Sequence, residues 1–175
     1  YFIGNWKMFG VPKSINILNK INSFYLKDKN RKKYRVIFTP PYTLIESYSK
    51  HFKNKKIIIG SQNCYQKDHF SSNTAAVSPF MIKSVGAQYT LVGHSDNRIE
   101  GDTNHMLRNK VQFALKNNLQ VVFCIGENKK EKKNKKTLNV LTRQISQVLN
   151  KNLKKNNIIV AYEPIWSIGT GKIPN

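Results

Sequence analysis

The sequence contains no long apolar run, and its first residues do not follow the pattern of a secretory signal. No run approaches the roughly 18 apolar residues of a membrane-spanning helix, so we expect a soluble protein without a membrane partner. The first residues show no basic stretch followed by an apolar one, so we expect no secretory signal. The chain begins with Tyr1 rather than Met, so we expect a few residues to precede it.

Cysteine is scarce as well. The two cysteines, Cys64 and Cys124, are far apart, and each lies in or beside an apolar run. No CxxC pair or Cys/His cluster with zinc spacing is present. The sequence therefore predicts two reduced, half-buried thiols in a cytoplasmic protein, and no metal site.

Acidic residues are few: 9 Asp and Glu stand against 30 Lys and Arg, for a net charge of +21. Such a balance can mark a nucleic-acid-binding protein. The densest basic run, residues 128–136, contains no aromatic residue and so offers nothing for base stacking. We therefore favour a solvated basic surface over a nucleic-acid partner. The positive electrostatic field of such a surface would attract an anionic substrate.

The length and composition indicate one domain. A chain of 175 residues with 39% hydrophobic residues can bury one sizeable core but not two. No linker, low-complexity spacer or composition shift marks a boundary. We therefore treat residues 1–175 as a single domain.

Short continuous apolar runs predict strands that are buried on both faces of a parallel sheet. The expected strands are Phe2–Asn5, Tyr34–Phe38, Ile57–Ser61, Tyr89–Val92, Val121–Ile125 and Ile158–Tyr162.

Amphipathic helical patterns lie between these runs. One follows a candidate N-cap at Ser14 and a second follows Thr103. The expected apolar faces are Ile17, Ile21, Phe24 and Tyr25 in the first helix; Leu107, Val111, Ala114 and Leu115 in the second; and Leu138, Leu141, Ile145, Val148 and Leu149 in a third. Shorter helices are expected near Leu44–Phe52 and Pro79–Val85.

The alternation of strands and helices predicts an α/β fold with a parallel sheet and right-handed crossovers. Both an open doubly wound sheet and a closed eight-stranded barrel fit this order. Periodicity alone does not decide between them.

Polar residues follow three of the strands. Asn5 and Lys7 lie at the end of the first, His94 at the end of the fourth and Glu163 at the end of the sixth. In a barrel these ends form one rim, where active sites are built. A carboxylate base, a neutral imidazole and a cation suit proton transfer next to a carbonyl. The remaining histidines, His51, His69 and His105, are interpreted as structural.

Six motifs resemble those of the triosephosphate isomerase family, in that family's order and at nearly its spacing. They are GNWKM (4–8), QNCY (62–65), SPFMIKSVGA (78–87), LVGHSDNR (91–98), CIGE (124–127) and AYEPIWSIGTGK (161–172). The resemblance covers the whole chain and implies a TIM (β/α)8 barrel. It further implies a cytoplasmic homodimer of glycolysis and gluconeogenesis that interconverts D-glyceraldehyde 3-phosphate and dihydroxyacetone phosphate, without metal or organic cofactor.

The resemblance also implies roles for the residues at the rim. Glu163 would be the base that moves a proton through an enediol(ate), and His94 the neutral electrophile at the carbonyl. A short helix at 95–98 would disfavour imidazolium at His94. Lys7 would neutralise phosphate and oxyanion charge, and Asn5 would donate a hydrogen bond beside it. Asp96, Cys124 and Glu127 would support these groups.

The segment after Glu163 resembles the family's phosphate-gripping lid. Its two glycines permit close approach to a ligand, and the backbone N–H of Gly169 is the candidate phosphate donor. The lid residues implied by the resemblance are Pro164, Ile165, Trp166, Gly169, Thr170, Gly171 and Lys172.

The sequence departs from the family pattern in two places. Asp96-Asn97 stands where Glu-Arg is usual, so that the carboxylate facing Lys7 is one methylene shorter. In the loop 72–77, Thr74 is kept as the expected dimer contact, but Ala75 and Ala76 replace the Gly and the acidic residue. The joint loss of the Glu and the Arg favours an altered dimer interface.

The chain is also short for the implied fold. An eight-unit barrel typically needs about 250 residues, whereas this sequence ends at Asn175, where the sixth helix is expected to begin. We therefore expect an incomplete barrel of strands 1–6, lacking strands 7 and 8, which is inactive by itself.

Two alternatives stay open at this point. A catalytically silent homologue with an interaction role is supported by Asp96 and the altered loop. A basic nucleic-acid-binding domain would bind with steep salt dependence.

Overall fold

Six parallel strands form one sheet whose spatial order is the order of the sequence. The computed structural model describes residues 1–149, 153, 157–171 and 173. The strands are β1 (Phe2–Asn5), β2 (Val36–Thr39), β3 (Ile57–Ser61), β4 (Tyr89–Val92), β5 (Gln120–Ile125) and β6 (Ile158–Tyr162). Five of the six agree with the predicted strands to within a residue, whereas β2 begins two residues later than predicted.

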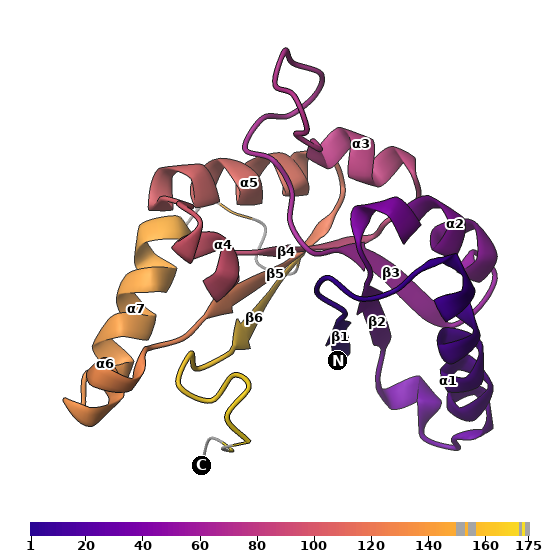
Figure 1. The fold of residues 1–175 in the computed structure, drawn as a ribbon, viewed down its shortest axis with the longest axis horizontal. Coiled ribbons are helices and arrows are strands. Elements are labelled where there is room, and N and C mark those ends of the chain that lie inside the picture. The colour runs from indigo at the N-terminus through magenta and orange to yellow at the C-terminus, as the bar shows by residue number, and fades with distance from the viewer. Residues whose placement is uncertain (150–152, 154–156, 172, 174–175) are drawn as a thin grey trace.

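The helices lie in an arc outside the curved sheet (Figure 1). They are α1 (Ile15–Lys27), α2 (Tyr42–Phe52), α3 (Pro79–Ser84), α4 (Ser95–Ile99), α5 (Asn104–Lys116), α6 (Lys129–Lys133) and α7 (Thr137–Val148), with short 3-10 turns η1 (Pro12–Ser14) and η2 (Arg31–Lys33). A doubly wound sheet would carry helices on both faces. The sheet therefore curls as part of a barrel, which decides between the two alternatives.

The barrel is open between β1 and β6. Each of these strands pairs on one side only within the described residues. Figure 1 shows both strands beside the gap in the arc of helices. Large apolar side chains stay exposed along these edges, with Phe2 at 64%, Val160 at 46% and Tyr162 at 44%. The predicted incomplete barrel with strands 1–6 is therefore observed.

Two apolar layers cover the two faces of the sheet. The concave inner face is filled by Ile37, Tyr89, Leu91 and Val122. On the outer face, side chains such as Ile59 and Phe123 pack against the helices. All four residues of β4 are buried, because both faces of a parallel sheet are covered. This is why the strands read as continuous apolar runs.

The face that the first helix turns to the core agrees only in part with the predicted one. Leu18, Asn22 and Tyr25 are buried, whereas Ile17 and Phe24 are 54% and 77% exposed. The hydroxyl of Tyr25 donates to the carbonyls of Arg31 and Tyr34, and this anchors the observed face. The prediction is confirmed for Tyr25 and for Ile21, which packs against the core, and is wrong for Ile17 and Phe24, because it counted apolar residues and gave no weight to a polar anchor.

The predicted caps have mixed outcomes. Thr103 caps α5, since its hydroxyl accepts from the N–H of Met106. Ser14 precedes α1, but its hydroxyl accepts from the N–H of Val11 and makes no cap. In α7, Val148 is buried as expected, whereas Leu138 is 77% exposed in the first turn.

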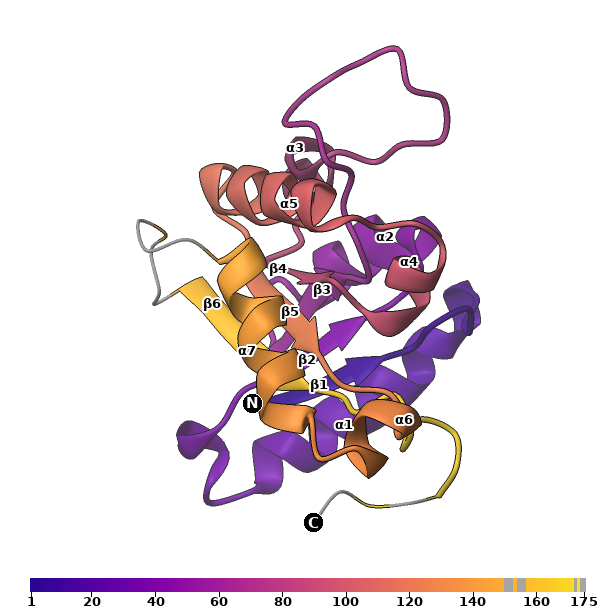
Figure 2. The same cartoon turned by 90° about the vertical axis from the view of Figure 1, so that its left-hand side faces the viewer.

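A long loop between β3 and α3, residues 62–78, extends away from the sheet (Figures 1 and 2). Its residue Ala75 has a φ of 64°. That left-handed conformation brings the Cβ of an L-residue close to the following carbonyl oxygen and costs about 1–2 kcal/mol. Ala75 is thus strained at the position where the family pattern has Gly.

We predict that Ala75→Gly raises the free energy of unfolding by about 0.5–1 kcal/mol. The free energy gained by relieving the left-handed strain exceeds the free-energy cost of the extra conformational entropy that glycine gives the unfolded chain. Urea titration of both proteins measures the difference. The matched control is Ala76→Gly, at a residue without positive φ, which should lower stability. Equal effects of the two changes would contradict the strain at Ala75.

Candidate active site

The ends of three strands bring the candidate catalytic residues to one rim. Asn5 is the last residue of β1, His94 follows β4 after Gly93, and Glu163 directly follows β6. The N–H of Glu163 donates to the carbonyl of Ile125 at 2.8 Å, which extends the β5–β6 pairing by one step. Because the strands are parallel and adjacent, their carboxyl ends lie at the same edge of the sheet.

His94 and Glu163 face each other. The His94 Nε2 lies 3.5 Å from the Glu163 Oε2. The imidazole is almost fully buried, and Glu163 Oε2 is buried without a hydrogen-bond partner among the described residues. A buried carboxylate oxygen with no donor is costly, so it marks an acceptor that is kept free at the rim.

The backbone of α4 sets the tautomer of His94. This residue occupies the N-cap position, and its Nδ1 accepts from the N–H of Asp96 at 3.1 Å. An accepting Nδ1 carries no proton, so the ring is neutral and presents its N–H at Nε2. The proton of the imidazole therefore points toward Glu163 rather than toward α4.

Lys7 is held in an unusual backbone conformation, with a φ of 51°. The side-chain oxygen of Asn5 accepts from the Lys7 N–H at 2.9 Å. The Gln62 Nε2 donates to the carbonyls of Lys7 at 2.7 Å and Thr39 at 2.9 Å. Strained backbone of this kind persists where the surroundings determine it fully, and it clusters at functional sites.

The ammonium of Lys7 pairs with Asp96, as predicted from the sequence. The Nζ lies 3.2 Å from Oδ2, and the two side chains are 42% and 55% exposed. An exposed pair of this kind contributes about 0–1 kcal/mol. The shorter Asp side chain thus reaches Lys7, which removes one of the two supports for a silent homologue.

Cys124 lies at the end of β5, behind Glu163. Burial raises the pKa of its thiol well above the ordinary value, and the nearby charge of Glu163 adds to the shift. Burial likewise raises the pKa of Cys64 to about 12. Both thiols are free and buried, so neither is a thiolate at neutral pH.

The backbone at Gly126, two residues after Cys124, passes close to Glu163. A Cβ at Gly126 would collide with the carbonyl oxygen of Glu163, so only glycine fits there. The guanidinium of Arg98 donates to the carbonyls of Gly93 at 2.7 Å and Cys124 at 3.2 Å. These contacts tie the ends of β4 and β5 together beneath the site.

Glu127 is a buried hub between β5, β6 and the segment after Glu163. It is 1% exposed, and its carboxylate accepts from the hydroxyl of Thr137, the hydroxyl of Tyr162 and the indole N–H of Trp166. Burial acts to raise the pKa of this carboxyl, but the three hydrogen bonds outweigh it and lower the pKa from its ordinary value. Glu127 is therefore an anion that fixes its surroundings.

The lid segment begins with hydrogen bonds to this hub. The N–H of Ile165 donates to the carbonyl of Glu127 at 3.0 Å, and the N–H of Ser167 to that of Pro164 at 2.9 Å. Gly169 and Gly171 have φ values of 69° and 70°, in the region that favours glycine. The hydroxyl of Thr170 donates to the carbonyls of Trp166 and Ser167. Lys172, which was also predicted as part of the lid, lies outside the described residues.

Sequence reasoning missed Gln62 and Arg98 as positioning residues. Gln62 belongs to a family motif and directly follows β3, which is the signal that could have identified it. Arg98 likewise belongs to a family motif, LVGHSDNR, but its role depends on the carbonyls of Gly93, after β4, and Cys124, in β5, which the sequence does not bring together. Thr74, the predicted dimer contact, is exposed on the long loop between β3 and α3.

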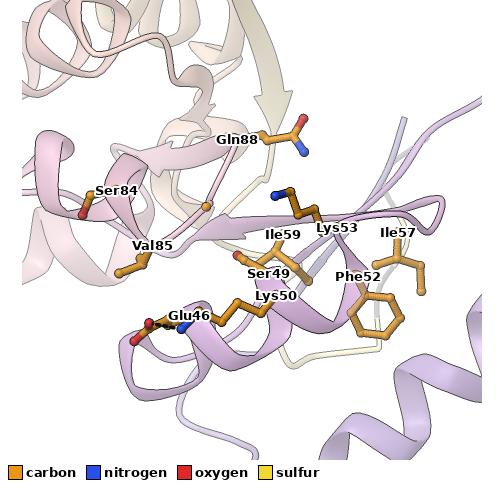
Figure 3. A pocket seen from close by; sticks show the side chains of 11 residues that line it. Glu46, Ser49, Lys50, Phe52, Lys53, Ile57, Ile59, Ser84, Val85 and Gln88 are labelled. Atoms are coloured by element: carbon orange, nitrogen blue, oxygen red, sulfur yellow. Dashed lines mark hydrogen bonds and ion pairs between the residues drawn. The ribbon is translucent and has the colours of Figure 1, made fainter.

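A cavity of about 320 Å³ lies at the other end of the strands, between α2 and α3. Figure 3 shows side chains from α2, β3 and the chain after α3 around it, among them Phe52, Ile57 and Gln88. None of the candidate catalytic residues lines this cavity. It sits beside the starts of β3 and β4, the end of a barrel that serves stability.

No helix in the described ranges has the length and apolar character needed to cross a membrane. Within those ranges there is also no group of three or more His, Cys, Asp or Glu side chains placed to hold a metal ion.

The curled parallel sheet and the acid–base groups at its carboxyl rim define an enzyme of the (β/α)8-barrel class. The model of the triosephosphate isomerase family matches residues 1–175. The chain belongs to the triosephosphate isomerase family.

Relatives from distant organisms support this assignment. The triosephosphate isomerase of Bartonella henselae is 36% identical over 98% of this chain and 67% of its own length. Those of Leptospira interrogans and Yarrowia lipolytica are 36% and 35% identical, and the chain spans 68% of each. The crystal structure of the Bartonella henselae enzyme superimposes with a TM-score of 0.86 at 34% identity, over 94% of this chain and 68% of that one.

We predict that Glu127→Gln lowers the free energy of unfolding at pH 7 by about 1–3 kcal/mol, because hydrogen bonds to a charged acceptor are lost. The folded pKa of Glu127 lies below its ordinary value of 4.5. As the pH falls, Glu127 is therefore protonated in the unfolded chain before it is protonated in the folded chain. The stabilisation from its ionised carboxylate is complete above pH 4.5 and disappears as the pH falls through the folded pKa.

Urea midpoints at pH 7 and at several values below pH 4.5 measure this loss. The difference in urea midpoint between the parent and Glu127→Gln should decrease as the pH falls. Glu46→Gln, which alters an exposed pair with Lys50, serves as the control and should change stability by less than about 0.5 kcal/mol. A difference in urea midpoint that stays constant down to low pH would contradict the role of Glu127 as a buried anion.

Proposed function

We propose that this chain carries the first six strands of an enzyme that interconverts D-glyceraldehyde 3-phosphate and dihydroxyacetone phosphate. The observation that carries the proposal is the 3.5 Å approach of the His94 Nε2 to a Glu163 oxygen that has no hydrogen-bond partner among the described residues. A neutral donor and a free carboxylate at one rim are what a proton shift between adjacent carbons requires.

Glu163 is the base in this proposal. Its free oxygen removes a proton from the carbon next to the substrate carbonyl and returns it to the neighbouring carbon, while the hydroxyl proton passes to the former carbonyl oxygen. The carboxylate is therefore restored after each turnover. The buried flank formed by Cys124 and the close backbone passage at Gly126 hold the carboxylate at the rim.

His94 is the electrophile. Its Nε2–H donates to the carbonyl oxygen, where negative charge develops in the enediolate. The Asp96 N–H keeps Nδ1 occupied, so the ring donates as a neutral imidazole. A neutral imidazole can stabilise the charge on an enediol(ate) oxygen through this hydrogen bond while its own charge stays unchanged.

Lys7, Asn5 and the lid bind the phosphate end. The Lys7 ammonium supplies positive charge for phosphate and for the developing oxyanion. The side-chain oxygen of Asn5 is engaged by the Lys7 N–H, which leaves its amide N–H groups to donate to the substrate. The N–H of Gly169 donates to the phosphate once the lid has closed over it.

The proposed assembly is a homodimer in the cytoplasm that serves glycolysis and gluconeogenesis, as in the family. The loop of residues 62–78 supports it, because it extends from the sheet (Figure 1) and carries Thr74 as an exposed residue. Met8 and Phe9, 95% and 76% exposed on the loop after β1, supply apolar surface of the kind that interfaces bury. We propose no nucleic-acid or membrane partner.

We predict that the 175-residue chain does not isomerise triose phosphate by itself. Within the part of the chain that the structure describes, β1 and β6 each pair on one side only, and a barrel in this state lacks part of the wall that surrounds the site. A coupled assay on this chain, and on the same chain continued by the last third of the Bartonella henselae enzyme, measures the difference. Comparable turnover in both proteins would contradict the need for closure.

We predict that Glu163→Asp in the extended enzyme lowers kcat by at least about 100-fold with little change in KM. The shorter side chain moves the carboxylate by about 1 Å, and a displacement of that size is enough for such a loss. Steady-state kinetics in both directions give kcat and KM. Glu100→Asp, an exposed position outside the site, is the control and should leave both unchanged. An unaltered kcat in Glu163→Asp would remove Glu163 as the base.

A further inference from the structure

The cavity between α2 and α3 has an apolar floor that belongs to the core. Phe52 of α2 and Ile57 and Ile59 of β3 line it, and each is 3% exposed. The volume of about 320 Å³ lies at the lower end of the range for small-molecule sites. Because β3 pairs with a neighbour on both sides, the cavity is not a product of the open edges at β1 and β6.

One close approach of two backbones shapes a wall of this cavity. Gly86 has a φ of 93°, and a Cβ built on it would lie 2.9 Å from the Cβ of Ser49. Glycine is therefore needed for the chain after α3 to come this near to α2. The contact covers Ser49 and sets the distance between the two walls.

The hydroxyl of Ser49 lines the cavity without a partner. Its Oγ is buried and makes no hydrogen bond among the described residues. Ser47 of the same helix, by contrast, donates to the carbonyl of Leu44 at 3.1 Å. Ser84, on the α3 side, donates to that of Met81 at 2.8 Å. A buried hydroxyl with no partner is costly, so the Ser49 Oγ marks a place where an occupant of the cavity would gain a hydrogen bond.

The cavity also has an exposed lysine that no acidic residue neutralises. Lys50 pairs with Glu46, with its Nζ 2.6 Å from Oε1. Lys53 lines the same cavity and has no ion pair within the ranges that the structure describes. Figure 3 shows the Lys53 side chain apart from the Glu46–Lys50 pair. The positive charge of Lys53 is thus available to an anion.

The spacing of Ser49 and Lys53 suits a carboxylate. Residues four apart on a helix lie on one face, with Cβ atoms about 5–6 Å from each other. One carboxylate oxygen can accept from a hydroxyl while the other accepts from an ammonium. The volume corresponds to about ten water molecules, and the ring of Phe52 in the floor favours an aromatic body.

We propose that this cavity is a ligand site, separate from the catalytic rim, for a small aromatic carboxylate. The ring of the ligand packs on Phe52 and Ile59, and its carboxylate accepts hydrogen bonds from Ser49 and Lys53. The site is independent of the proposed isomerase activity, because no residue of the rim lines it. Water is the alternative occupant of a cavity that contains a polar group.

Titration of the 175-residue chain with 4-fluorobenzoate, followed by fluorine NMR, measures occupancy. We expect a Kd of about 1 mM or lower, which ligands of this size can reach. The neutral probe 4-fluorobenzyl alcohol should bind at least about fivefold more weakly, because it lacks the charge that pairs with Lys53. Val85→Trp places an indole in the cavity and should abolish binding.

Three results of this titration would overturn the site. Absence of binding at about ten times the expected Kd would leave water as the occupant. Equal affinity for the charged and the neutral probe would remove the preference for an anion. Binding that persists in folded Val85→Trp, with folding checked by its urea transition, would place the probe elsewhere on the protein.

Substitutions of lysine separate the site from the general basic surface. Lys53→Gln should weaken the binding of 4-fluorobenzoate about three- to fivefold, the range of a partly exposed ion pair. Lys53→Arg should keep the affinity within about twofold of the parent. Lys56→Gln removes the same charge from an exposed lysine that does not line the cavity and should leave the affinity unchanged. Equal weakening in Lys53→Gln and Lys56→Gln would overturn the role of Lys53.

A serine pair tests the unpartnered hydroxyl. Ser49→Ala should weaken the binding of 4-fluorobenzoate about threefold and raise the urea midpoint of the unliganded chain, because it removes a buried donor that the fold leaves unsatisfied. Ser47→Ala makes the same change at an exposed position of α2. It should leave the affinity unchanged and raise the urea midpoint by less. An unaltered affinity in Ser49→Ala, or a fall in its urea midpoint, would overturn the contact between Ser49 and the ligand.

Discussion

The pairing of β5 with β6 is the constraint on which the rest of the site depends. It runs from Val121↔Ile158 to Ile125↔Tyr162 and is extended by the hydrogen bond from the Glu163 N–H to the Ile125 carbonyl. A shift of one residue would turn every side chain of β6 to the opposite face. The carboxylate of Glu163 would then leave His94, which is fixed independently at the N-cap of α4. Correct register in one strand pair thus sets the geometry of the proton transfer.

The same pairing explains why a charged residue can be buried beside it. Glu127 follows β5 and Tyr162 ends β6, so the two strands deliver the anion and one of its donors to the same place. Thr137 and Trp166 satisfy the remaining lone pairs. A buried carboxylate is tolerated when its hydrogen bonds are complete. The carboxylate of Glu127 thus joins the sheet, the start of α7 and the beginning of the lid.

The departures of this chain from its family affect the rim less than the loops. Asp96 still reaches Lys7 in spite of its shorter side chain, and its backbone N–H orients His94 regardless of the side chain. At Ala75 a side chain stands in a left-handed turn. Strain is therefore tolerated on an exposed loop, whereas the geometry of the rim is maintained by backbone hydrogen bonds that substitutions do not remove.

The sequence by itself determined the strands, their order and the residues at their carboxyl ends, because continuous apolar runs and abrupt polar endings are local features. It also determined the family, through motifs such as AYEPIWSIGTGK. The tertiary structure alone decided that Leu18 and Asn22, rather than Ile17 and Phe24, join Tyr25 on the buried face of α1. It likewise decided that Gln62 and Arg98 support the site. These outcomes depend on contacts outside the residue's own helix or strand, which the periodicity of the sequence does not record.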